Sequence, residues 1–210
     1  MLILKIISAI TFIAMLVVNF LANSLPIGGN TTGDISSKYN SLFTPAGYTF
    51  SIWGLIYLLL TVFVVLIFVN SNLLSQHSNT ILILFIVTNI LNIMWLLAWH
   101  HNLIFLSTIV MIFFLVILII IIQTIPKTDL IPYITFSIYA GWISVAFIAN
   151  VTVLILKHQL PIFINHEMVW FFIVLAISLA IGLTMLIKEK NYYFAGVFLW
   201  AYIGIATKFL

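Results

Sequence analysis

The chain has 210 residues, of which 65% are hydrophobic and 5% are charged, whereas an ordinary soluble domain has about 25% charged residues. This composition excludes a soluble globular fold, because such a fold could not bury so much apolar surface. The net charge of +3 comes from lysines spread along the chain, which excludes a basic patch for nucleic acid, and the lack of cysteine excludes disulfides and thiolate metal sites.

Seven apolar segments are long enough to cross a membrane as helices, which takes about 20 residues at about 1.5 Å each. They are expected over residues 2–21, 48–69, 80–99, 103–122, 131–156, 169–187 and 192–209. Continuous runs of this length favour helices over the alternating strands of a membrane β-barrel. The sequence therefore predicts an all-α integral membrane protein, a single transmembrane domain over residues 1–210 with about seven helices.

Short connections between these segments predict an up-and-down bundle. His100-His101-Asn102 joins the third and fourth segments so tightly that they must form an antiparallel hairpin. With seven spans, four lysines lie on the N-terminal side and three on the other, which favours an N-terminus inside. We expect a multi-pass protein embedded in the lipid bilayer, in the cytoplasmic membrane if the source is bacterial.

One connection, from Asn23 to Gly47, is much longer than the others. It is rich in Pro, Gly, Ser, Thr and Asn, and it leads directly into the most aromatic helix entrance of the chain. Loops of this length in compact domains are commonly lids or binding loops, and the alternative is a plain connector.

The membrane interior holds essentially no ionisable residue, which disfavours a transporter with a carboxylate proton relay. The last segment contains no lysine in its middle, so a retinal protein is disfavoured too. All five histidines are expected in turns that face water or headgroups, and they predict no metal site. No nucleophile with a base and no paired carboxylates are visible, so no catalytic residue is assigned.

Aromatic and amide side chains remain as the candidates for function. Trp53 and Tyr57 are four residues apart, as are Trp95 and Trp99, so each pair forms a stripe on one helix face. Asn92 shares the face of Trp95. Such stripes occur both in helix packing and in pockets that stack a flat apolar ligand.

The fifth segment repeats this combination. Tyr139, Trp142 and Asn150 lie near one face, and Gly141 permits close approach of another helix. Buried amides in lipid need partners, so Asn92 and Asn150 should point into the bundle. Trp170 and Trp200 are expected instead as anchors at the membrane interface.

The run from Phe43 to Tyr57 resembles the entrance to the second helix of the TspO/MBR family, the tryptophan-rich sensory proteins related to the mitochondrial translocator protein. Trp53 and Tyr57 match its Trp-x-x-x-Tyr pair, and the Asn92-x-x-Trp95-x-x-x-Trp99 pattern is similar to its third helix. The chain departs from the pattern at Ala46 and Tyr48, where the family usually has Pro and Trp. The resemblance covers residues 1–156, so two helices in residues 157–210 add to a five-helix core.

The resemblance implies a membrane receptor or carrier that binds a porphyrin, a haem-like tetrapyrrole or a sterol in an aromatic pocket under the 23–47 loop. Residues that match the family or, for Trp142 and Asn150, follow from helix geometry are predicted to bind the ligand: Tyr48, Phe50, Trp53, Tyr57, Asn92, Trp95, Trp99, Tyr139, Trp142 and Asn150. No cofactor is required beyond a tetrapyrrole as ligand. The alternatives are an enzyme-like porphyrin degrader that uses pocket tryptophans and a structural membrane protein without a small ligand. A homodimer also remains open, with no interface indicated.

Overall fold

Seven α-helices and one short 3₁₀-helix account for most of the residues that the structure, a computed structural model, describes. These residues are 1–25, 29, 34–35, 38–39, 41–70, 73–74, 77–159 and 166–209. The elements are α1 (Leu2–Ser24), η2 (Gly47–Ser51), α3 (Ile52–Val69), α4 (Ser78–His100), α5 (Ile104–Thr124), α6 (Leu130–Lys157), α8 (Glu167–Ile187) and α9 (Tyr192–Thr207). All seven expected segments are confirmed as helices, with ends shifted by a few residues. The largest shift is at the second segment, whose first turn is the 3₁₀-helix η2.

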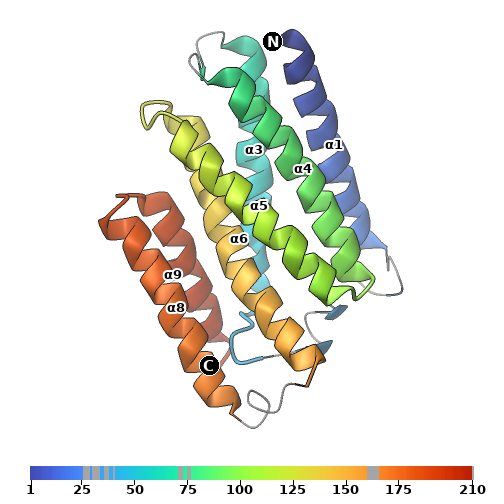
Figure 1. The fold of residues 1–210 in the computed structure, drawn as a ribbon, viewed down its shortest axis with the longest axis vertical. Helices are drawn as coiled ribbons and strands as arrows, with labels where there is room; N and C mark the ends of the chain where they lie inside the picture. The colour runs from blue at the N-terminus through green and yellow to red at the C-terminus, as the bar shows by residue number, and fades with distance from the viewer. Residues whose placement is uncertain are drawn as a thin grey trace.

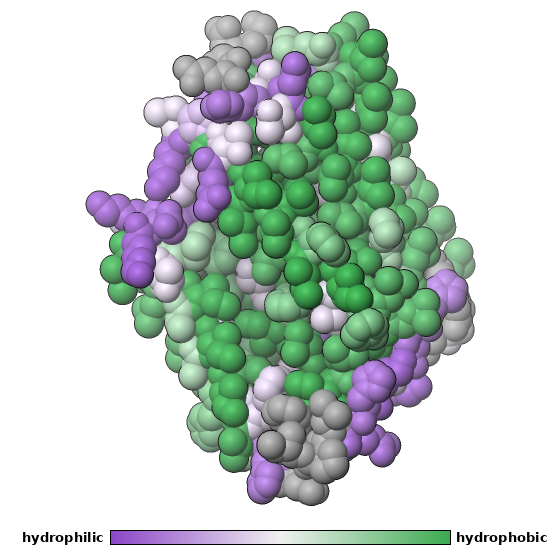
Figure 2. All heavy atoms as spheres, viewed as in Figure 1, coloured by the Kyte–Doolittle hydropathy of each residue, from purple (hydrophilic) through white to green (hydrophobic). Residues whose placement is uncertain are grey.

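The helices have the length and polarity of membrane spans. Six stretches are long and apolar enough to cross a bilayer: α1, η2 with α3, α4, α5, α6 and α8. Helix α9 has 16 residues, which corresponds to about 24 Å at about 1.5 Å per residue. Hydrophobic side chains cover most of the face in Figure 2, and hydrophilic ones gather toward opposite ends of the molecule. The predicted all-α membrane bundle is confirmed.

Helix α6 lies at the centre of the bundle (Figure 1). It packs against α5, α3 and α9, whereas α8 packs mainly against α9 and α1 packs mainly against α4. Helix α6 is correspondingly the most buried of the candidate spans, and α1 and α8 are the least buried. The hairpin of α4 and α5 that the short connection predicted is confirmed. The two termini lie toward opposite ends of the molecule (Figure 1).

Gly141 on α6 lies against α9. A Cβ atom at this position would lie 3.0 Å from the Phe194 backbone oxygen and 3.0 Å from the Cβ of Val197. A side chain would therefore push the two helices apart. The close approach expected from Gly141 is confirmed, and the partner helix is α9.

His100 does not face water or headgroups as the sequence predicted. It is the last residue of α4 and is completely buried, with Nδ1 2.8 Å from the Leu96 oxygen and Nε2 3.2 Å from the Ala22 oxygen. The Leu96 carbonyl lies near the C-terminal end of α4, and the Ala22 carbonyl is one of the last four of α1, which have no partner within their own helix. The imidazole is buried because it bridges the two helix ends.

The role of Trp170 and Trp200 as interface anchors stays a prediction, and both indoles have hydrogen-bond partners within the protein. The Trp200 indole donates to the Thr49 backbone oxygen of η2 at 2.9 Å, and the Trp170 indole donates to Thr152 Oγ1 of α6 at 3.2 Å. Both rings therefore point their N–H groups into the bundle, because the neighbouring elements offer acceptors there.

Candidate functional site

A cavity of about 670 Å³ lies within the bundle, toward the end where α1 and α4 terminate and η2 begins. We call it the aromatic cavity. Its walls come from α1, α3, α4 and α6, and the segment before η2 and the end of α9 complete it. The lining residues are Asn19, Asn23, Thr44, Pro45, Ala46, Gly47, Phe50, Trp53, Tyr57, Trp95, Leu96, Trp99, Trp142, Val145, Ala146, Ala149, Asn150, Val153 and Lys208.

Trp53 is the centre of the aromatic wall. Its ring stacks on Tyr57 at 5.6 Å between centroids and on Trp95 at 6.4 Å, with interplanar angles of 24° and 27°. Tyr139 and Trp142 meet the same ring edge-on at 6.2 Å and 6.3 Å. Rings at these separations attract one another and hold each other's orientation. Three helices, α3, α4 and α6, thus build one continuous wall of rings.

A hydrogen-bonded network of amides and phenols adjoins this wall. Asn19 donates to the side-chain oxygen of Asn92 at 2.7 Å, and Asn92 donates to the Tyr139 hydroxyl at 3.0 Å. The Tyr57 hydroxyl donates to the side-chain oxygen of Asn19 at 2.9 Å. The network links α1, α3, α4 and α6 through hydrogen bonds between their side chains. It fixes the positions of the two tyrosines against Trp53.

Asn150 is anchored by α5 from behind the cavity. Its side-chain oxygen accepts from Thr108 at 2.6 Å and from Ser107 at 3.2 Å, and its amide nitrogen lies 3.1 Å from the Ser107 hydroxyl. The expectation that Asn92 and Asn150 point into the bundle is confirmed. Both amides have protein partners, so they stabilise the helix arrangement around the cavity.

Two tryptophans of the lining carry indole N–H groups without an acceptor. Trp95 is 6% exposed and Trp142 is 2% exposed, and neither Nε1 atom has a hydrogen-bond partner. Buried donors of this kind are rare in folded proteins and call for an explanation. Protein atoms, and not the open space of the cavity, surround both nitrogen atoms.

The segment before η2 closes one side of the cavity and is held by α9. The Ala46 backbone N–H donates to the Gly204 oxygen at 2.9 Å, and the Tyr48 hydroxyl lies 2.8 Å from the Thr207 hydroxyl. At Gly204 the helix is so close to η2 that a Cβ atom would lie 2.0 Å from Thr49 Oγ1. This side of the cavity is therefore positioned by α9.

Lys208 is the charged residue among those that line the cavity in the described part of the chain. Its amine donates to the Ser41 backbone oxygen at 3.0 Å, which ties the end of α9 to the same segment. Burial lowers the pKa of the Lys208 amine from its ordinary value, and the nearby Glu167 carboxylate opposes this shift.

The structure brings most of the predicted binding residues together. Seven of the ten line the aromatic cavity: Phe50, Trp53, Tyr57, Trp95, Trp99, Trp142 and Asn150. Asn92 and Tyr139 are completely buried and contact the lining residues from behind. Tyr48 lies outside the lining, is 47% exposed and packs against Trp200.

Sequence analysis missed Asn19 and Asn23 on α1, both of which line the cavity. The signal was present, since the two amides are four residues apart on one face of an apolar helix. The predicted lid over residues 23–47 falls partly outside the described residues. The undescribed positions are 26–28, 30–33, 36–37 and 40, and the lid stays a prediction.

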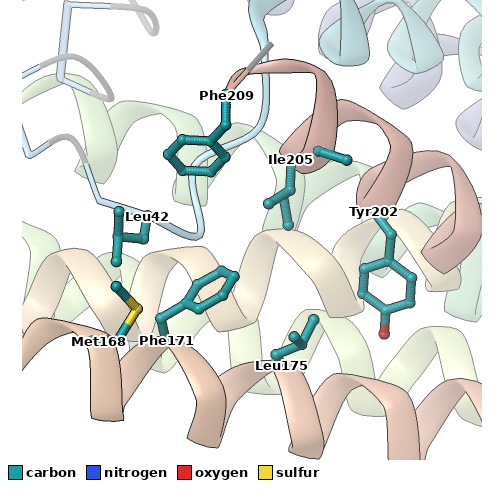
Figure 3. A pocket seen from close by; sticks show the side chains of 8 residues that line it. Leu42, Met168, Phe171, Leu175, Tyr202, Ile205 and Phe209 are labelled. Carbon is teal, nitrogen blue, oxygen red and sulfur yellow. The ribbon is translucent and has the colours of Figure 1, made fainter.

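A second, smaller hollow of about 400 Å³ lies between α8 and α9 (Figure 3). It is lined by Leu42, Met168, Phe171, Leu175, Tyr202, Ile205, Ala206 and Phe209. The polar atom that Figure 3 shows there, the Tyr202 hydroxyl, is 3.0 Å from the Ser178 hydroxyl of α8. This hollow offers apolar contact without a directed polar group. Elsewhere, no three His, Asp or Glu side chains in the described ranges gather in a way that could hold a metal ion.

A protein-family model described as TSPO-like protein matches residues 5–209. The chain belongs to the TSPO-like protein family. The match extends through α8 and α9. The two helices that the sequence analysis placed outside the family resemblance therefore lie within the region that the family model matches. No significant match was found to a curated protein or to a solved structure.

Proposed function

We propose that this TSPO-like chain is a membrane receptor or carrier that holds a flat apolar ligand, either a porphyrin-type tetrapyrrole or a sterol, in the aromatic cavity. The observation that carries the proposal is the wall of rings around Trp53, to which α3, α4 and α6 contribute. A flat apolar molecule gains both burial and ring contacts against such a wall. The volume of about 670 Å³ lies in the usual range of about 300–1,000 Å³ for small-molecule sites.

Binding fits the polar groups of the cavity better than acid–base catalysis. Amides, hydroxyls and indoles dominate the polar lining, and Lys208 is the one titratable amine among the described lining residues. General acid–base catalysis needs a group whose proton can transfer near neutral pH. The lining therefore supports recognition of a ligand rather than acid–base catalysis.

The direct test is a titration of the purified full-length protein with protoporphyrin, followed by tryptophan fluorescence. We expect saturable quenching, and the substitutions Trp53→Phe and Trp95→Phe should each weaken the apparent affinity about 3- to 10-fold, since each removes part of a stacking surface. Trp170→Phe is the matched control, because Trp170 lies on α8 outside the cavity lining. Quenching that does not saturate, as with an unrelated membrane protein, would reject a tetrapyrrole ligand.

One observation favours a second candidate, light-dependent porphyrin breakdown. Trp53, Trp95 and Trp99 form a chain of rings with centroid separations of 6.4 Å and 6.2 Å. Neighbouring indoles at these distances can supply electrons to an excited, oxygen-exposed ligand. Product formation that requires both light and molecular oxygen, and that falls in the Trp95→Phe variant, would establish this activity over simple binding.

A further inference from the structure

The hollow between α8 and α9 reaches from the surface of the bundle into its interior. Among its lining residues, Met168 and Phe209 are each 58% exposed, whereas Ile205 is 6% exposed. Helix α8 is the least buried of the candidate spans, so most of its surface meets lipid when it crosses a bilayer. Apolar cavities stay dry, because water finds no hydrogen-bond partner in them. The occupant of this hollow therefore comes from the hydrocarbon around it.

The hollow is elongated along the two helices. Its lining residues on α8 run from Met168 to Leu175, a distance of about 10 Å at about 1.5 Å per residue. In Figure 3, Leu42, Met168 and Phe209 lie at one end and Tyr202 lies at the other. The first of these ends is where α8 begins and α9 ends, and the second lies within the span of both helices. This shape fits a hydrocarbon chain that enters beside the helix ends and extends toward the membrane interior.

Two opposite charges lie at the helix-end side of the hollow. Glu167, which precedes Met168 in the chain, is exposed, and its Oε1 accepts from the Leu42 backbone N–H at 3.3 Å. The Lys208 amine donates to the Ser41 backbone oxygen at 3.0 Å. Because Ser41 and Leu42 are neighbours and Leu42 lines the hollow, the carboxylate and the amine both lie at this end. The hollow thus joins an apolar interior to an anion and a cation at the level where the helices end.

We propose that this hollow binds a membrane phospholipid with a zwitterionic headgroup that contains a phosphate and a primary ammonium group. One acyl chain lies between α8 and α9, where it gains contact with apolar side chains. The phosphate faces Lys208 and the ammonium group faces Glu167, so each charge of the headgroup meets an opposite charge. A purely anionic headgroup would instead place negative charge beside Glu167. The hollow and the aromatic cavity share no lining residue, so this inference goes beyond the proposed function.

The test compares two phospholipids that share palmitoyl and oleoyl chains: phosphatidylethanolamine, which is zwitterionic, and phosphatidylglycerol, which is anionic. Binding of each lipid to the delipidated full-length protein in detergent is measured by native mass spectrometry over a range of lipid concentrations. Ala206→Phe fills the hollow, and Ala176→Phe is its matched control, because Ala176 is an exposed alanine of α8 outside the lining. Glu167→Gln removes the anion, and Glu189→Gln, beyond the other end of α8, is the control for that change.

We expect the wild-type protein to bind phosphatidylethanolamine about 2- to 5-fold more tightly than phosphatidylglycerol, the usual effect of one exposed charge pair. Ala206→Phe should weaken the binding of both lipids about 10-fold or more, because displacing two buried methylene groups already has an effect of about this size. Glu167→Gln should abolish the preference between the two headgroups. Both control variants should behave like the wild-type protein, and circular dichroism of all four variants checks that they are folded.

Two results would overturn the proposal. Equal losses of lipid binding in Ala206→Phe and Ala176→Phe would show that lipid coats the helices without a site in the hollow. Equal affinity of the wild-type protein for the two lipids, or a preference that survives in Glu167→Gln, would show that the charges beside the hollow do not recognise the headgroup.

Discussion

Asn92 shows how single polar side chains determine the arrangement around the cavity. Its amide accepts from Asn19 of α1 and donates to Tyr139 of α6, so one residue of α4 connects three helices. Asn89, one turn earlier on the same helix, is equally buried but makes one side-chain hydrogen bond, to Thr11, and leaves its oxygen without a partner. The two amides offer a matched pair for mutation.

The substitution Asn92→Leu should lower the free energy of unfolding by about 1–2 kcal/mol, because it removes two hydrogen bonds and leaves Asn19 and Tyr139 without their partners. Asn89→Leu should lower the free energy of unfolding by a smaller amount. It removes one hydrogen bond, to Thr11, and an amide oxygen that accepts no hydrogen bond. Unfolding of both variants by sodium dodecyl sulfate in mixed micelles, followed by circular dichroism, measures the difference. Equal losses would show that the network adds no stability beyond burial of an amide.

Among the elements, α9 positions η2 and the segment that closes one side of the aromatic cavity. It binds η2 through the Trp200 indole and approaches it so closely at Gly204 that no side chain fits. Gly196, two turns earlier on α9, has no atom within 4 Å of the position where a Cβ would lie. Thr49 and Trp200 are 151 residues apart in the chain, so the contact is entirely tertiary.

The substitution Gly204→Ala should therefore lower the free energy of unfolding by about 1–3 kcal/mol, the usual cost of overpacking, and weaken protoporphyrin binding by moving η2 and Phe50. Gly196→Ala is the control on the same helix and should leave stability unchanged or raise it by about 0.5–1 kcal/mol through helix propensity. Thermal unfolding and fluorescence titration of both variants provide the measurements. Unaltered binding in Gly204→Ala would show that the contact of α9 with η2 does not shape the binding site.

At the scale of the whole molecule, the alternating helices place the aromatic cavity in the half of the bundle away from the N-terminus (Figure 1). The lysines divide four to three between the two ends, with Lys5, Lys127, Lys188 and Lys190 on the N-terminal side. The positive-inside tendency favours the end with more lysines as the cytoplasmic one. The aromatic cavity would then lie in the half of the membrane away from the cytoplasm.

Cysteine labelling tests this orientation cleanly, because the chain has no native cysteine. In intact cells, a membrane-impermeant maleimide should label His158→Cys and Phe209→Cys but reach Glu189→Cys only after permeabilisation. All three positions are exposed at helix ends. Labelling of position 189 from outside, with 158 protected, would reverse the orientation, and labelling of 189 and 209 from the same side would show that α9 does not cross the membrane.

Much of the candidate site follows from local spacing. Residues four apart on a helix share a face, so Trp53 with Tyr57 and Trp95 with Trp99 were predictable as stripes, and the structure turns both stripes toward one cavity. The spacing of Asn19 and Asn23 could have marked them as candidates, but nothing near Asn19 in the chain indicates that Asn92 lies 2.7 Å away. Tyr48 shares the entrance motif but turns toward Trp200, since η2 winds as a 3₁₀-helix against α9.

A seven-helix membrane bundle with an aromatic second helix could be predicted from the sequence, because hydrophobicity and helical period are properties of neighbouring residues. Which helices meet depends on tertiary contacts. These contacts place Asn19 in the polar network, bury His100 between two helix ends, leave the indoles of Trp95 and Trp142 without acceptors and bring α9 against η2 at one side of the cavity. These features depend on contacts between residues far apart in the chain, where packing and hydrogen-bond geometry, rather than local composition, determine which side chains are satisfied.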